Sequence, residues 1–363
     1  MRRVFPAALV LSAALLLARV SPAQDSSAAS NPPQAAAPSQ ATAPGAQTAP
    51  VPQVVAPASQ ATVWRVRTEP DTLVNGAPAI LYVVPPIKLE SLSGTWMGHQ
   101  IFFSFDPASH SWYALFGTGL NRPPGKYPLV LEGRTAPGTT APGTTASFQQ
   151  ELEVARQAYP QVELKVQHQF TAPSRRLLKR IRKEEILKHR VFAESTEAQL
   201  WRGPFLAPLR EPVTEQFGVR RIFNGELKTE HLGLDFHAPR GTRVQAANSG
   251  RVILARRLFF EGNCVIVDHG EGLMTLYMHL SKFKVRKGQR VRRGQLLGLS
   301  GATGRATGPH LHLAVRWEGV YLDPAKLLKL DLPRTEAPHS ALAGAREPSE
   351  RSGAAQGRAV SQN

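Results

Sequence analysis

The sequence predicts a mainly β protein: a small N-terminal β-sandwich, a connector helix and a C-terminal glycine-rich antiparallel β domain. Three observations support this. Short alternating runs of apolar and polar residues recur from Val63 onward, with turn residues between them. Glycine marks almost every turn after Pro204. One Pro-free stretch rich in Leu, Lys, Arg and Glu separates the two regions. A chain of 363 residues is longer than one core usually holds, so two domains are expected.

Both ends of the chain differ in composition from the rest. Residues 1–23 have a positive start, a short apolar run and small residues at 21–23, which is typical of a secretory signal peptide. An uncleaved anchor is the alternative, and a lipid anchor is excluded because no cysteine lies nearby. We therefore expect an exported protein, in the periplasm or at the cell wall or outside the cell. Residues 24–60, rich in Ala and Pro, predict a disordered tether, and residues 331–363 predict a disordered tail.

Residues 61–168 predict the sandwich, with turn chemistry at Asn75-Gly76 and Asp106-Pro107. Ala-Pro-Gly-Thr-Thr occurs twice in succession over residues 136–145 and is expected to form a low-complexity loop. The expected strands cover residues 63–67, 79–84, 101–105, 127–131, 152–154 and 162–166.

Residues 169–203 predict a basic connector whose helix runs from Ser174 to about Ala193. Glu184 and Lys188 stand four apart in the favourable order. The many Lys and Arg side chains could bind an anionic surface, but we favour a solvated helix between two domains. Its apolar positions do not predict one clean face, so a membrane helix is not expected.

The chain holds 44 Lys and Arg against 27 Asp and Glu, a net charge of +17, which favours a polyanionic partner. Export would exclude nucleic acid, limit membrane contact to the passage itself, and leave anionic cell-envelope polymers. Cys264 is the one cysteine, so no intramolecular disulfide can form, and its apolar surroundings predict a buried core thiol.

Three short motifs within residues 231–312 contain four histidines and an aspartate. Side chains two apart on a strand share a face, which predicts that His231 and Asp235 lie together, and likewise His310 and His312. Thr275, Tyr277 and His279 predict a third such set. Catalytic zinc sites use three His or carboxylate ligands and an open position. His231, Asp235 and one of the closing pair meet that count, and the remaining histidines would handle protons.

The other histidines lack ligand spacing. His99, His110 and His168 are expected at the surface or in turns, and His237 and His269 as structural residues. A single His-x-x-x-Asp or His-x-His occurs by accident, but three such sets in order within one glycine-rich β region favour a metal site.

Three motifs carry a family resemblance: His231-Leu-Gly-Leu-Asp235, Thr275-Leu-Tyr-Met-His279-Leu and Gly304-Arg-Ala-Thr-Gly-Pro-His310-Leu-His312. Together they resemble the signatures of the lysostaphin/LytM-type zinc endopeptidases, over about residues 205–326. The resemblance implies a peptidase domain over residues 204–330, with the duplicated hybrid motif or barrel-sandwich type of fold. The region from Trp64 to Val166 is similar, less closely, to the β-rich domain that precedes the peptidase in some envelope members.

By this resemblance His231, Asp235 and His312 would hold one Zn²⁺. His279 and His310 would be the catalytic histidines, one deprotonating a water and the other steadying the oxyanion, with the assignment open. The implied substrate is a peptide bond of peptidoglycan, in the stem-peptide cross-link or a glycine-rich bridge.

Two alternatives remain. Some relatives have lost ligands and only bind the wall or activate an amidase, but all five positions are kept here. The paired glycine turns near residues 241–252 and 288–298 are also similar to a biotinyl-type carrier, although no turn lysine is flanked as such carriers need. The bond cut, the oligomeric state and the role of the first domain (inhibiting, targeting or recruiting) stay open.

Overall fold

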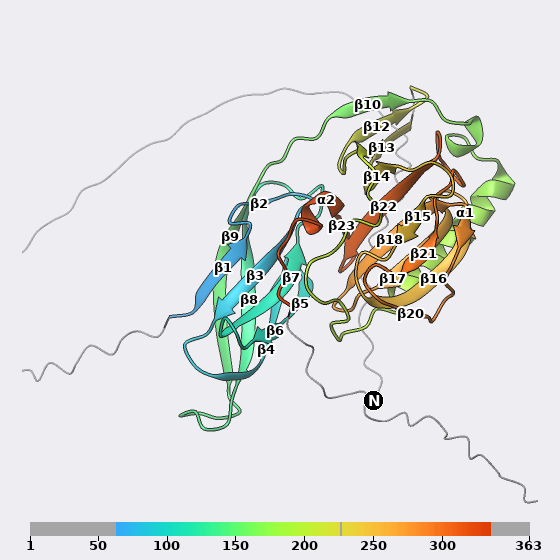
Figure 1. Ribbon diagram of the computed structural model, residues 1–363. Coiled ribbons are helices and arrows are strands. Elements are labelled where there is room, and N and C mark those ends of the chain that lie inside the picture. Colours follow the sequence, from blue (N-terminus) through green and yellow to red (C-terminus); the bar gives the residue numbers. More distant parts are fainter. Residues whose placement is uncertain (1–62, 226, 335–363) are drawn as a thin grey trace, which may run out of the picture. The chain divides into compact units, whose positions relative to one another are not determined.

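The computed structural model describes residues 63–225 and 227–334 (Figure 1). The predicted signal peptide, the tether and the tail beyond residue 334 lie outside these residues. The described part is mainly β, as predicted, with the helices η1 (His168–Phe170), α1 (Arg175–Phe192) and α2 (Pro324–Leu327). None of these helices is both long and apolar enough to cross a membrane.

The first domain consists of two packed sheets. Trp96 is fully buried between them and meets Phe116 of the opposite sheet edge-on, with ring centroids 5.6 Å apart. The first sheet has the order β1 (Arg65–Glu69), β3 (Pro78–Val84), β7 (Ser111–Gly117) and β6 (Ser104–Asp106). The second has the order β2 (Leu73–Val74), β9 (Thr145–Ala155), β8 (Gly125–Thr135), β4 (Leu89–Trp96) and β5 (His99–Phe102). The doubled pentapeptide connects β8 to β9 as a loop, as expected.

Two of the expected strands behave differently from the prediction. The one over residues 101–105 is interrupted at Phe103, where the chain passes from one sheet to the other. The one over residues 162–166 forms β10 (Gln161–Leu164), which does not belong to the sandwich. It pairs in parallel with β12 (Arg220–Phe223), which in turn pairs antiparallel with β13 (Leu227–Glu230). With only two apolar side chains, β10 has little to bury and occupies a sheet edge.

Helix α1 begins where Ser174 Oγ accepts the Leu177 N–H, close to the predicted start. It packs against β16 along one side, which was not predicted, while most of its residues are exposed. Its Val191 is buried with apolar residues of the large sheet. Glu184 accepts the backbone N–H of Phe259 at 2.6 Å. The apolar residues of the helix do not share one face, because Leu178 and Ile186 are exposed and the packed side includes Glu184 and Lys188.

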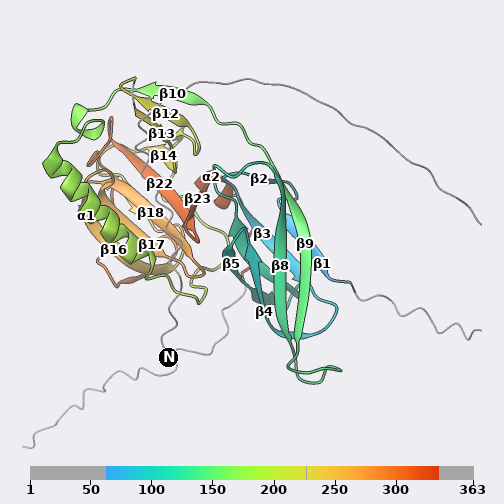
Figure 2. The same ribbon diagram turned by 180° about the vertical axis from the view of Figure 1, so that it is seen from behind.

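The second domain is built on one large sheet and a small one (Figures 1 and 2). Its central strand β22 lies between β14 and β18, so residues of β22 are shielded on both sides. The large sheet has the order β11 (Val213–Glu215), β14 (Leu234–His237), β22 (His310–Trp317), β18 (Leu273–Leu280), β17 (Gly262–Asp268), β16 (Gly250–Leu258) and β20 (Arg290–Val291), with β23 (Val320–Leu322) on β22. The small sheet has the order β15 (Arg243–Gln245), β21 (Leu296–Leu299) and β19 (Lys282–Phe283).

The two glycine-turn units pair with each other. Strand β15 of the first unit pairs with β21 of the second, and β16 pairs with β20. The turn glycines extend this exchange, because the Gly294 N–H donates to the Ala246 carbonyl and the Gly288 N–H to that of Val252. Each unit therefore completes the ladder of the other.

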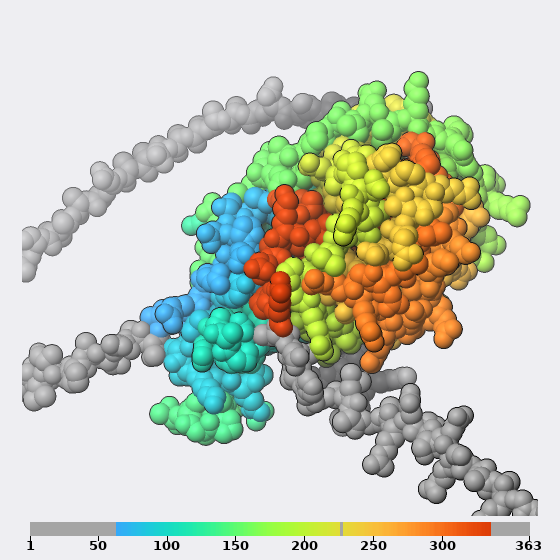
Figure 3. All heavy atoms as spheres, in the orientation of Figure 1, coloured from blue at the N-terminus to red at the C-terminus, as the bar shows by residue number. Residues whose placement is uncertain are grey.

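One hydrophobic cluster runs through both domains. Leu322 of β23 packs so closely on Gly117 of β7 that any Cβ there would overlap it. His99, expected at the surface, is half-buried and contacts the Trp317 ring at 5.6 Å. The C-terminal segment with β23 and α2, red in Figure 3, lies against the blue strands of the sandwich.

Candidate metal centre

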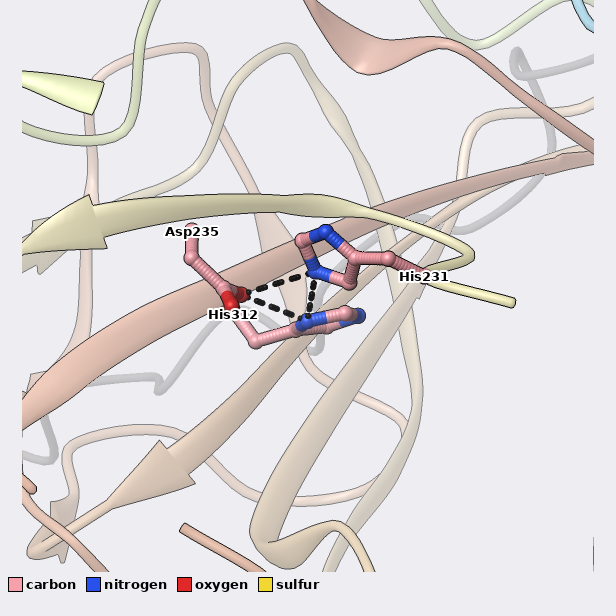
Figure 4. Close-up of side chains that lie close together, drawn as sticks. All are labelled: His231, Asp235 and His312. Carbon is pink, nitrogen blue, oxygen red and sulfur yellow. Dashed lines mark hydrogen bonds and ion pairs between the residues drawn. The ribbon is translucent and has the colours of Figure 1, made fainter. Parts of the chain in front are cut away.

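The three predicted ligands come together at the start of β14 and on β22 (Figure 4). Asp235 and His312 are direct cross-strand partners. His231 lies in the loop before β14, which begins at Leu234, so it does not share a strand face with Asp235 as predicted. The loop brings it there because Gly233 carries no side chain, and a Cβ at that position would overlap the His312 ring.

The donor atoms of these residues converge on one point. His231 Nε2 lies 3.1 Å from both His312 Nδ1 and Asp235 Oδ1, and the last two atoms are 2.7 Å apart. The residues are 1%, 8% and 6% exposed, respectively, so water does not separate them.

This donor set fits one zinc ion. The Gln216 carbonyl, 2.7 Å from His231 Nδ1, can only accept a hydrogen bond, so Nδ1 carries the proton and Nε2 keeps its lone pair. Two imidazoles and one carboxylate form a known set of catalytic zinc ligands, with ligand distances of about 2.0–2.2 Å and a fourth position left open.

The second oxygen of Asp235 is held from outside the ligand set. Asp235 Oδ2 accepts a hydrogen bond from Arg221 at 2.6 Å, and Arg221 in turn pairs with Glu215. Burial raises the pKa of Asp235, but the charge of His312 and the close contacts with His312 and His231 hold it well below its usual range. The side chain is therefore a carboxylate at neutral pH.

His279 and His310 stand beside this trio with their rings 4.7 Å apart. Each Nδ1 donates to a backbone carbonyl, that of Thr303 at 2.8 Å for His279 and that of Gly308 at 2.9 Å for His310. Each Nε2 therefore keeps its lone pair. His279 lines the groove described below, and His310 Nε2 lies 3.9 Å from Asp235 Oδ1. Burial, together with the charges of His310 and His312, lowers the pKa of His279 to about 3.

His279 also departs from the expected shared face with Thr275 and Tyr277. Its φ of 62° lies in the left-handed region, which is uncommon for a non-glycine residue and bends the strand end out of its regular alternation. Thr275 and Tyr277 instead join a buried network with His269. That network agrees with the prediction that His269 is a structural residue.

A groove continues from the five residues. Its further lining was not expected from the sequence and comprises Arg221, Glu230, Leu232, Phe260, Glu261, Met278, Arg305 and Tyr321. Leu232, Met278 and Arg305 lie within the three motifs, whereas the others come from strands and turns outside them, so no spacing in the sequence marks the lining as one set.

Comparison with known proteins agrees with the motifs. Residues 229–324 match the model of Peptidase family M23. Over 122 residues the chain is 47% identical to peptidoglycan DD-endopeptidase ShyA of Vibrio cholerae serotype O1, covering 33% of this chain and 28% of that protein. Over 117 residues it is 38% identical to DD-carboxypeptidase/endopeptidase Mpg of Neisseria meningitidis serogroup B, covering 32% and 27%. The chain thus spans only about a quarter of the length of these relatives.

A solved structure extends the likeness beyond the groove. A Pseudomonas aeruginosa protein assigned to peptidase M23 is similar over 70% of this chain and 94% of its own, with a TM-score of 0.52 and 29% sequence identity. This coverage exceeds residues 229–324, so the likeness includes part of the chain outside the matched family model.

Proposed function

We propose that this chain, which carries a peptidase family M23 domain at residues 229–324, is a zinc-dependent endopeptidase that cuts peptide bonds in peptidoglycan cross-links. The observation that carries the proposal is the convergence of three ligand atoms beside two histidines, of which His279 lines the groove and His310 has its Nε2 3.9 Å from Asp235 Oδ1. The relatives named peptidoglycan endopeptidases support the substrate.

The chemistry divides among the five residues. His231, Asp235 and His312 would hold Zn²⁺, which when bound lowers the pKa of a water and polarises the scissile carbonyl. His279 and His310 are oriented by the backbone carbonyls at their Nδ1 atoms. One accepts the proton of the attacking water at Nε2, and the other, once protonated, donates to the oxygen on which negative charge develops.

We further propose that the protein acts outside the cytoplasm, in the periplasm or at the wall. The signal-like residues 1–23 support export, and the net charge of +17 favours contact with anionic envelope polymers. Peptidoglycan stem peptides are then the substrate within reach.

Digestion of purified peptidoglycan by the full chain tests the proposal. Treatment without chelator, with chelator, and with chelator followed by zinc should give new peptide ends that appear, vanish and return, and mass analysis would name the bond. If zinc-loaded protein produces no new ends but raises the activity of an added amidase, the chain is a regulator and the proposal is wrong.

A further inference from the structure

Arg305 lies at the groove in an unusual setting. It belongs to the loop between β21 and β22, and its guanidinium stands between two aromatic rings, 4.8 Å from the centroid of Phe223 and 4.9 Å from that of Phe260. It lines the same groove as His279 and His312. The two rings restrict its rotamers and orient its planar fork of donors.

The guanidinium has no ion-pair or hydrogen-bond partner among residues 63–225 and 227–334. The other charged side chains of the groove are engaged. Glu261 pairs with Lys188 at 2.6 Å and Glu230 accepts from Asn121 at 2.9 Å, while Arg221 is held by Asp235. Burial and the nearby charge of Arg221 lower the pKa of Arg305 to about 10, against the opposing charge of Glu261, so it is a cation at neutral pH. A half-buried cation of this kind favours an anion supplied from outside the described chain.

The loop fixes Arg305 relative to the catalytic histidines. Its backbone N–H donates to the Phe260 carbonyl at 2.8 Å, and two residues earlier the Thr303 carbonyl holds His279. The loop sits directly on the turn before β17, because Gly304 and Gly262, with φ of 78° and 64°, approach so closely that a Cβ on either would overlap the other segment.

We propose that Arg305 binds a carboxylate of the substrate peptide next to the scissile bond, so that the groove prefers cross-links with a free carboxylate there over amidated ones. This inference rests on the proposed function and narrows its substrate class. A guanidinium and a carboxylate can form two parallel charge-assisted hydrogen bonds, a pairing that a neutral amide does not reproduce. Because the rings already orient the fork, little side-chain freedom is lost on binding.

The test measures binding separately from hydrolysis. The full-length, zinc-loaded His279→Asn protein, whose amide can still donate to the Thr303 carbonyl, is titrated calorimetrically with two cross-linked stem-peptide dimers. The dimers differ only in whether the carboxylate beside the scissile bond is free or amidated. The free carboxylate should bind about 10- to 100-fold more tightly. Adding Arg305→Gln should remove this preference by weakening the carboxylate dimer alone, and Arg305→Lys should restore part of it.

Arg316 offers a matched control. It is also half-buried, and its guanidinium lies over the Phe192 ring at 4.1 Å, but it does not line the groove. Arg316→Gln should leave the preference unchanged. Equal affinity for the two dimers in the His279→Asn protein, or an equal loss on both from Arg305→Gln at unchanged zinc content, would overturn the assignment. A preference in binding together with no hydrolysis of either dimer by wild-type protein would keep Arg305 as the carboxylate site and refute the endopeptidase.

Discussion

The second domain contains two groups of histidines on its β scaffold, His269 in one and His279 with His310 in the other, and their hydrogen bonding differs. His269 donates from Nδ1 to the Ser249 carbonyl at 2.7 Å, and its Nε2 lies 2.7 Å from the hydroxyl of Thr275. His279 and His310 make the first kind of bond only. Neither Nε2 has a hydrogen-bond partner among the described residues, and that of His310 lies 3.9 Å from Asp235 Oδ1. One network is closed and the other is open.

Burial and pKa do not distinguish His269 from His279. Burial lowers the pKa of His269 to about 4, and it is the largest influence lowering that of His279 to about 3. The distinguishing property is the second ring nitrogen. Where it has a partner the histidine stabilises the fold, and where it has none the histidine is available for chemistry.

The largest effect is expected at the metal ligands. Asp235→Ala removes the one carboxylate of the trio, so zinc content should fall to near zero and peptidoglycan hydrolysis with it. Elemental analysis of the purified protein and fragment mass analysis would measure both. If the variant still binds one zinc ion per molecule, Asp235 is not a metal ligand.

His279→Ala should separate metal binding from activity. Zinc content should stay at the wild-type level because His279 is not a ligand, whereas the hydrolysis rate should fall about 10²- to 10⁴-fold with the loss of a proton-transfer group. Retention of full hydrolysis with zinc bound would show that the assigned roles are wrong.

Arg221→Gln tests whether the hydrogen bond from Arg221 to Asp235 supports metal binding. Without the hydrogen bond to Asp235 Oδ2, the carboxylate is less well oriented, and zinc affinity should fall about 10- to 100-fold. Competition with a chelator of known affinity measures this, and excess zinc should restore most of the hydrolysis. An unchanged affinity would make Arg221 irrelevant to the metal.

Thr275→Val tests the closed network. The change leaves His269 Nε2 buried without its hydrogen-bond partner, so the free energy of unfolding should fall by about 1–3 kcal/mol. Zinc content and hydrolysis per folded molecule should not change, as denaturant titration beside activity assays would show. A loss of hydrolysis at unchanged stability would mean that the two networks are coupled.

The smallest effect concerns Glu271, a buried carboxyl whose Oε2 accepts the Trp201 Nε1–H at 3.1 Å. Burial raises its pKa from 4.5 to about 8 in the folded protein. The unfolded chain releases this proton above pH 4.5, so the contribution to stability is full below that pH and is lost as pH rises toward 8. Melting temperatures across this range should therefore fall more steeply for wild type than for Glu271→Gln. If melting temperature falls equally with pH in both proteins, Glu271 is already ionised in the folded protein and the expected pKa shift is wrong.

The motif residues were predictable because each is fixed by its neighbours in sequence. His310 and His312 share one strand, and the spacing of His231 and Asp235 spans a single short loop. The role of Arg221 was not predictable, because it comes from strands that meet only after folding. Arg305 lies within the third motif, but its position between two aromatic rings could not be predicted from it. The strands β4 and β7 were missed for similar reasons: β4 mixes Ser and Gly with apolar residues, and β7 is buried on both faces and does not alternate. Helix α1 was placed correctly, but its packing on β16 was not predicted, because the packed side includes the half-buried side chains of Glu184 and Lys188.

The hydrophobic cluster that continues from Trp96 and Phe116 through Leu322 to Trp317 has a consequence for how the molecule melts. Domains with separate cores can unfold independently, whereas elements that share one core lose it together. Calorimetry should therefore show a single cooperative transition for the sandwich and the large sheet of the second domain. Cleavage of the chain between η1 and α1 should leave the two pieces associated, and the groove should persist as long as the sandwich stays folded.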